Sequence, residues 1–312
     1  MGIFKSHIHT FCMEYKNTSK GDSLFSGDVL TFGQQAIYST IGDARKIIAK
    51  YDYIKMNELP YNYDTSNKIP SWEGTPRAKN TNAQSLFKIL GADNVYVADI
   101  SDYENPDFLI DLNYPVDPAY HDRFDTIVDV GTLEHLFDVP TALENIIKML
   151  KHNGTLVSVL PSSNLIDHGF YSFSPTLFYD FFMTNGFNKI SCYLREYSPF
   201  VYEKKGRLYK YKYVDREIPI ISSNSVELTF IATKTDDCDQ NNILKPIQGV
   251  YQKSKYWNND KSDIEKQLPD RLKKFLLLVL FYVGPVLPKF FIRIIYNKGR
   301  ITRKNIHYLG RY

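Results

Sequence analysis

The sequence predicts an α/β protein with a mostly parallel sheet, helices on both faces of the sheet and an antiparallel last strand. From about residue 28, short apolar runs alternate with helical patterns, which is typical of parallel strands joined by helices. The run 155–161 is mostly apolar, as expected for a strand buried on both faces. The run 225–235 alternates in part between apolar and polar residues, which indicates an antiparallel strand near a sheet edge.

The predicted elements follow one another in a regular order. A first strand at 28–32 leads into Gly33, and apolar spacing over 37–48 predicts a helix after it. Residues 51–80 are rich in Tyr, Pro and Asn without a sustained period, and they predict a long loop or lid. The further predicted strands are 94–100, 107–113, 125–131 and 188–194, and the further helices run from Ala83 to Gly91, from an Asp138 N-cap toward Gly154, and from Ser174 to Gly186.

Composition indicates an ordinary globular protein of a reducing compartment. The 312 residues are 43% hydrophobic and 23% charged, which excludes disorder as the default. The three cysteines lack CxxC spacing, so they predict neither a zinc site nor a disulfide framework and favour a cytoplasmic location. We find no signal peptide and no uncharged stretch as long as the roughly 18 residues of a membrane span. The opening MGIFKS fits the N-myristoylation pattern, which often arises by chance.

The chain divides into four predicted segments. Residues 1–27 form an N-terminal extension, 28–235 the α/β domain, 236–270 a polar linker, and 271–312 a basic, apolar helical tail. The tail holds ten Lys or Arg and no acid, whereas the first 270 residues carry 28 basic and 35 acidic groups. The two parts therefore have opposite net charge.

The stretch 124–161, FDTIVDVGTLEHLFDVPTALENIIKMLKHNGTLVSVLP, resembles the class I S-adenosylmethionine-dependent methyltransferases. That family carries FD-x-apolar-x, then LEH, then a helix ending in LKPGG and a strand ending in Pro. Here the helix end reads LKHNG, and Asn153 and Gly154 preserve the turn because both tolerate a left-handed backbone. More loosely the resemblance covers 28–235. It implies a Rossmann-like fold, S-adenosylmethionine as cofactor and methyl transfer as the reaction.

The resemblance also implies which residues bind the cofactor. Asp99 matches the position that accepts hydrogen bonds from the ribose hydroxyls, and Asp111 with Leu112 matches the adenine site. Gly33 would let the backbone approach the methionine part at a helix N-terminus, and Asp129 closes the strand that borders cofactor and acceptor. In open α/β sheets such ligands lie beyond the carboxyl ends of the strands. Turn or cap roles are the alternative for Asp99 and Asp111.

Two features depart from the family pattern. The sequence after the first strand is TFGQQA, with one glycine in place of a GxGxG run, so Gln34 and Gln35 either occupy cofactor space or replace its contacts. The link 101–107 is also short for a parallel crossover. Seven extended residues reach roughly 23 Å, enough to return along a five-residue strand without a helix.

Two histidines are candidates for the catalytic base. Methyl transfer to a hydroxyl needs a group that removes the proton, and a histidine suits that task near neutral pH. We prefer His168, with Glu134 and His135 shaping the site, although His135 is the other candidate base. A satisfied buried histidine and a simple ion pair of Glu134 are the structural alternatives. Phe170, Tyr171 and Phe173 predict an aromatic acceptor wall. No cluster has recognisable metal-ligand spacing, so the sequence predicts metal independence.

Other functions are weaker. A binding or scaffold protein that kept the fold but lost the cofactor would explain the missing glycines. A dinucleotide enzyme would need GxGxxG after the first strand, and nucleic-acid methylation would need an NPPY-type or Pro-Cys motif; neither is present. The acceptor is therefore expected to be a small molecule or a glycan, with polysaccharide decoration as an analogy only. The sequence leaves the oligomeric state open.

The tail predicts peripheral contact with an anionic membrane, at the inner face. Residues 275–288 form an uncharged run too short to span a bilayer, and cations follow it. Each Lys or Arg near an anionic surface is worth roughly 1 kcal/mol. The full chain should co-sediment with anionic vesicles at low salt more than a chain ending near Asp270 does. Equal recovery of both in the supernatant would favour the alternative, a pair of helices packed on the core.

Overall fold

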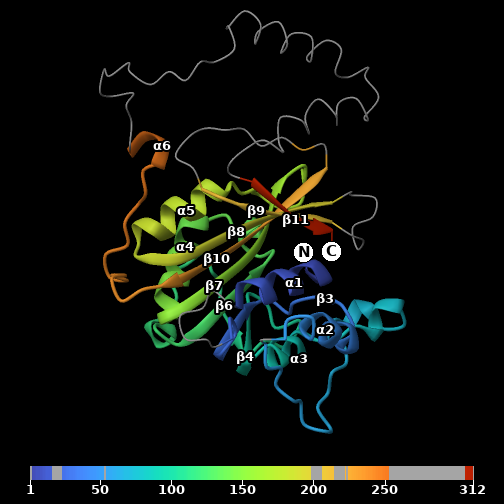
Figure 1. Cartoon of the computed structure of the whole chain (residues 1–312). Helices are drawn as coiled ribbons and strands as arrows, with labels where there is room; N and C mark the ends of the chain where they lie inside the picture. The colour runs from blue at the N-terminus through green and yellow to red at the C-terminus, as the bar shows by residue number, and fades with distance from the viewer. Residues whose placement is uncertain are drawn as a thin grey trace, which may run out of the picture.

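The computed structural model describes residues 2–15, 23–52, 54–197, 206–213, 222, 224–252 and 306–311. Nine of its strands form one sheet in the order β11-β9-β8-β10-β7-β6-β2-β4-β5 (Figure 1). In chain order these strands are β2 (Gly27–Phe32), β4 (Ala92–Asp99), β5 (Phe108–Leu109), β6 (Phe124–Val130), β7 (Leu150–Ser163), β8 (Phe187–Tyr197), β9 (Arg207–Tyr211), β10 (Ser225–Lys234) and β11 (Ile306–Arg311).

Strand directions confirm the predicted α/β class. Strands β5, β4, β2, β6 and β7 run parallel to one another. Strand β10 runs antiparallel between β7 and β8, as predicted for 225–235, but the predicted position near a sheet edge is wrong because β9 and β11 lie beyond β8. Strands β9 and β11 extend the sheet by further antiparallel pairing, which the sequence analysis did not predict.

The end of the chain differs from the predicted helical tail. Strand β11 pairs with β9 and satisfies backbone groups that would otherwise form an open edge. Residues 253–305, which include the rest of the tail and part of the predicted linker, lie outside the described residues. Within the described part of the chain, no helix is long and apolar enough to cross a bilayer.

The helices cover both faces of the sheet, as expected. Figure 1 shows α1, α2 and α3 grouped on one side and α4 with α5 on the other. The strands alternate accordingly, since Val29 and Val128 join the core with the first group while Leu30 and Ile127 join the other core. The helices are α1 (Lys5–Glu14), α2 (Ile41–Ile48), α3 (Ala83–Ile89), α4 (Val139–Met149), α5 (Pro175–Thr184) and the short α6 (Gly249–Gln252).

Two predicted elements are wrong in their extent. Ile37 is not helical: β3 (Ile37–Tyr38) pairs with β1 (Ile3–Phe4), and α2 begins only at Ile41 after the Thr40 cap. Gly33 is therefore not at a helix N-terminus. The predicted strand 107–113 shrinks to β5 because the Asp111 side chain accepts from Asn113 N–H (2.9 Å) and turns the chain.

Local signals elsewhere are confirmed. The Asp138 side chain caps α4 by accepting from Thr141 N–H (3.1 Å). Asn153 adopts the left-handed conformation expected of it, with a φ of +63°, although it lies within β7 rather than in a separate turn. The link between β4 and β5 contains no helix, and Asp107 holds it by accepting from Val97 N–H (2.8 Å).

Candidate functional site

The strand order reverses at β2, which lies between β4 and β6. The chain passes from β2 outward through β4 to β5, and then returns to build β6 and β7 on the other side. Ligands of open α/β sheets bind beyond the carboxyl ends of the strands at such a reversal. The residues that follow β2, β4, β6 and β7 are therefore the first to consider.

Gly33 and Asp99 lie side by side at this edge. Gly33 N–H donates to Ala98 O (2.7 Å), which brings the turn after β2 against the end of β4. Gly33 has a φ of +75°, and a Cβ added there would lie 3.5 Å from Asp99 Oδ2. The Gly33 backbone and the Asp99 carboxylate are thus near neighbours at this edge.

A second carboxyl group joins this pair. Burial and the nearby negative charge of Asp99 raise the pKa of Glu104, while the Gln34 backbone N–H bonds it. The Asp99 carboxylate itself accepts from Ser101 N–H (3.0 Å). Sequence reasoning missed Glu104, although an acid within a short crossover at a strand's carboxyl end was a usable signal.

The two glutamines after Gly33 have separate roles. The buried Gln35 side chain folds back and donates to Phe32 O and, at 3.4 Å, to Gly33 O. It occupies the interior of the turn. Gln34 instead reaches α3, where its amide pairs with that of Gln84 (3.3 Å). The turn after β2 is therefore held by side chains as well as by its backbone.

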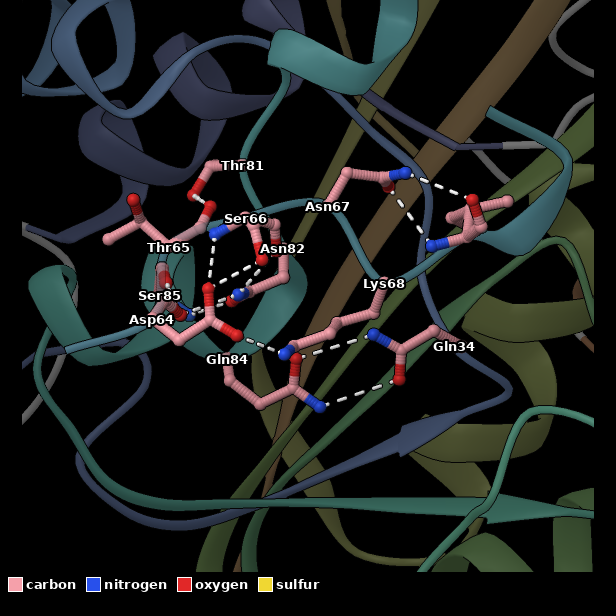
Figure 2. A network of polar contacts seen from close by, with 11 residues as sticks. Gln34, Asp64, Thr65, Ser66, Asn67, Lys68, Thr81, Asn82, Gln84 and Ser85 are labelled. Atoms are coloured by element: carbon pink, nitrogen blue, oxygen red, sulfur yellow. Dashed lines mark hydrogen bonds and ion pairs between the residues drawn. The ribbon is translucent and has the colours of Figure 1, made fainter. Parts of the chain in front are cut away.

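The predicted lid docks on the N-terminus of α3. Among the described residues of 51–80, helical turns occur only as η2 (Pro70–Trp72) and η3 (Pro76–Lys79). Asn82, the cap of α3, donates to Asp64 O (2.9 Å) and Ser66 O (2.8 Å). Figure 2 shows this network beside the Gln34–Gln84 pair, with the Lys68 ammonium bonded to Asp64. The lid and the Gln34 side chain are thus both attached to the N-terminal part of α3.

The predicted adenine-binding residues are placed differently from each other. Asp111 uses Oδ1 for the turn to Asn113, through both the backbone N–H and the side-chain amide (each 2.9 Å). The Leu112 side chain is buried in the core, so only its backbone could face a ligand. The turn role considered for Asp111 therefore accounts for one of its two oxygens.

Asp129 is fully buried at the end of β6. Its Oδ1 accepts from Thr132 N–H (2.9 Å) and Leu133 N–H (3.4 Å), which shapes the turn into η5 (Leu133–His135). Burial raises the pKa of Asp129 to about 6. The hydroxyl of Thr132 donates to Phe32 O (3.0 Å) and so connects this turn to the turn that begins at Gly33.

Glu134, His135 and His168 form a compact cluster just beyond Thr132. Glu134 Oε1 lies 3.8 Å from His135 Nε2 and 3.6 Å from His168 Nε2. The Glu134 side chain is 0% exposed, whereas those of His135 and His168 are 52% and 34% exposed. Neither carboxyl oxygen of the Glu134 side chain has a hydrogen-bond partner among the residues that the structure describes, and the same holds for His168 Nε2.

Backbone contacts bring the distant His168 to Glu134. The N–H groups of Phe170 (2.7 Å) and Tyr171 (3.3 Å) both donate to Glu134 O. A Cβ added to Gly169 would lie 2.7 Å from that oxygen, so only glycine permits this approach. The loop after β7 is thereby fixed on η5.

The charges of the cluster are set by burial. Burial, followed by the negative charge of Asp129, raises the pKa of Glu134. Burial lowers the pKa of both His135 and His168. Burial thus favours the uncharged imidazoles, which offer lone pairs.

Aromatic side chains flank the cluster on its solvent side. Phe137 and Phe170 are exposed and meet edge to face, with ring centroids 6.1 Å apart. Tyr171 O–H donates to Phe137 O (3.0 Å) and holds this pair in place. The prediction that Phe173 belongs to the same wall is wrong, because Phe173 is buried and packs on Phe178 in the core.

Comparisons with known proteins give weak likenesses. No family model matches the chain, and no curated protein matches it. A Burkholderia thailandensis 1,6-didemethyltoxoflavin-N1-methyltransferase, crystallised with S-adenosylhomocysteine, is 13% identical over 74% of this chain and 78% of its own, with a TM-score of 0.35. An S-adenosylmethionine-dependent methyltransferase from Archaeoglobus fulgidus is 10% identical over 74% and 94%, with a TM-score of 0.35. A further such methyltransferase, from Thermotoga maritima, is 14% identical over 73% and 92%, with a TM-score of 0.34.

At these identities and TM-scores the likeness carries no argument about activity. The α/β class rests instead on the strand order and on the directions of the strands.

Replacing Gly169 by alanine should destabilise the protein. The new Cβ would collide with Glu134 O, and the φ of +155° disfavours a side chain, so we expect a loss of about 1–3 kcal/mol in the free energy of unfolding. Gly42→Ala is the matched control. It lies in α2 with nothing within 4 Å of the added Cβ, and it should stabilise by about 0.5–1 kcal/mol. Urea unfolding measures both, and equal effects would contradict the close approach.

Proposed function

We propose that this protein is an S-adenosylmethionine-dependent methyltransferase that acts on a small-molecule acceptor. The observation that carries the proposal is the meeting of two groups of residues at the strand reversal. Gly33 and Asp99 form one group, and Glu134, His135 and His168 form the other. The hydrogen bond from the Thr132 hydroxyl to Phe32 O joins the two turns that carry them.

The first group suits the ribose and methionine parts of the cofactor. The backbone of Gly33, which carries no Cβ, lies next to Asp99 Oδ2. A carboxylate at this place accepts hydrogen bonds from a diol. Glu104, whose pKa is raised by burial and by the charge of Asp99, adds a second carboxyl group beside it. When bound, the cofactor supplies a methyl group on a sulfonium sulfur.

The second group suits an acceptor hydroxyl. Methyl transfer needs two reactants in line and a place for the acceptor's proton, so positioning and deprotonation are the protein's main tasks. An uncharged imidazole at His135 or His168 can accept that proton. We assign this role to His168 first, because the loop from Gly169 to Tyr171 fixes its position. The exposed pair Phe137 and Phe170 can stack on a ring or on the apolar face of a sugar. A glycan is therefore included in the proposed acceptor class.

A second function follows from the filled turn after β2. Gln35 bonds Phe32 O and Gly33 O from inside this turn, where the resemblance implies backbone contacts to the cofactor. A binding or scaffold protein without cofactor would keep such a turn closed. Calorimetry with S-adenosylmethionine separates the two functions, because only the methyltransferase should bind it.

Asp99→Ala should weaken the binding of S-adenosylmethionine by about 1.5–3 kcal/mol, the range for hydrogen bonds to a charged group. Isothermal titration calorimetry on the full chain measures this loss. Asp93→Ala is the control: Asp93 is an exposed carboxylate near the opposite end of the same strand, and its loss should leave affinity unchanged. Equal affinity of both folded variants would remove Asp99 from the cofactor site.

His168→Ala should lower methyl transfer roughly 100-fold or more while S-adenosylmethionine affinity stays near the wild-type value. The reason is that His168 belongs to the acceptor side of the junction. Turnover is measured against a panel of sugars, lipids and phenols. A loss in His135→Ala with an unaffected His168→Ala would give the leading role to His135, and no loss in either would exclude a hydroxyl acceptor that needs this assistance.

A further inference from the structure

We propose that Glu134, His135 and His168 bind a divalent transition-metal ion. One carboxylate and two imidazoles offer ligand atoms that all lie within 4.8 Å of one another. Such a site differs from the metal independence that the sequence predicts. Its role in activating an acceptor rests on the proposed methyl transfer, whereas binding of the ion itself does not.

The distances suit a shared ion after a small contraction. Two ligands that are each about 2.0–2.2 Å from a tetrahedral zinc ion are roughly 3.3–3.6 Å apart. Glu134 Oε1 lies 3.6 Å from His168 Nε2 and 3.8 Å from His135 Nε2. These two distances need to shorten by only a few tenths of an ångström, whereas the two imidazole nitrogens, which lie within 4.8 Å of each other, can have further to move. Half-exposed His135 can supply that movement by a side-chain rotation.

The state of Glu134 is the second, independent observation. Its side chain is fully buried, and both oxygens lack a hydrogen-bond donor among the described residues. A buried carboxyl without partners is costly, because it loses its hydration and gains nothing in return. His168 Nε2 is also buried and has no hydrogen-bond partner among the described residues. It lies 3.6 Å from Glu134 Oε1, compared with 3.8 Å for His135 Nε2. One cation between these atoms would satisfy all of them at once.

The donor set favours a transition metal over magnesium. Imidazole with carboxylate suits zinc, iron or manganese, whereas magnesium prefers an all-oxygen shell with several waters. Thiolates do not compete here, since Cys12, Cys192 and Cys238 are buried in the two cores. Three protein ligands leave a position open, as in catalytic zinc sites.

An ion at this place changes how His168 acts in the proposed reaction. Its Nε2 then holds the ion rather than the acceptor's proton. An acceptor oxygen in the open position would have a lowered pKa, as metal-bound water has, and would lose its proton to solvent before the methyl group arrives.

The test is metal binding by the full chain, without an affinity tag and after chelator treatment. Isothermal titration calorimetry uses ZnCl2, with MnCl2 and MgCl2 as comparisons. The wild type should bind one equivalent of zinc, and His135→Ala and His168→Ala should each weaken that binding roughly tenfold or more. His152→Ala is the matched control, because His152 lies 3.8 Å from Asp236 in an exposed pair and its loss should change nothing.

Absence of stoichiometric binding of either transition metal would overturn the proposal, and so would unchanged affinity in a folded His135→Ala variant. His135 is half exposed, so this variant keeps the test decisive even where a change at buried Glu134 prevents folding. S-adenosylmethionine titrated into the same protein separates the two proposals. Binding of the cofactor without binding of zinc would support the proposed methyltransferase and contradict the metal site. Binding of zinc without binding of the cofactor would support the metal site and contradict the methyltransferase.

Discussion

The parallel pairing of β2 with both β4 and β6 is the constraint on which the other features of the site depend. The register aligns Val29 to Thr31 of β2 with Thr126 to Val128 of β6, and Phe32 with Ala98 of β4. Because these strands share one direction, their carboxyl ends open at one edge of the sheet. The Gly33 turn, Asp99 and the turn at Asp129 are neighbours for this reason. A register slip of one residue would exchange the two cores and separate these groups.

A second constraint acts within that edge. Asp129 is buried to shape the turn into η5, and this turn directs Glu134 inward, where it has no donor within the described part of the chain. The loop after β7 reaches the same place because Gly169 allows close contact with the Glu134 carbonyl. Two buried acids and two imidazoles therefore share a small volume, at a cost in stability that packing elsewhere must offset. Such a local conflict is more typical of a functional site than of a purely structural one.

The lid and the glutamines hold the turn after β2 and the start of α3 by side-chain contacts. Gln35 fixes the turn from inside, while Gln34 and the network of Asp64 and Asn82 tie the lid, α3 and the turn together (Figure 2). A glycine-rich turn offers backbone N–H groups with little hindrance, whereas here side-chain amides limit the space. The turn after β2 and the lid are thus both anchored on α3. This arrangement links the first and second proposed functions to the same few hydrogen bonds.

The sequence by itself determined the features that depend on local pattern. Alternation and apolar runs indicate the strands, Asp138 is identified as a cap by the residues around it, and acids at strand ends mark the edge of the sheet. Only the tertiary structure decided what depends on partners distant in the chain. Pairing with β1 turned Ile37 from a helix into a strand, and core packing took Phe173 from the acceptor wall. The sequence assigned Glu134, His135 and His168 to one site, but the distances between them are set by a loop from another strand and by one glycine contact. The periodicity of a sequence indicates which face of its own helix or strand a residue occupies. Which side chains from different elements meet depends on how those elements pack against one another.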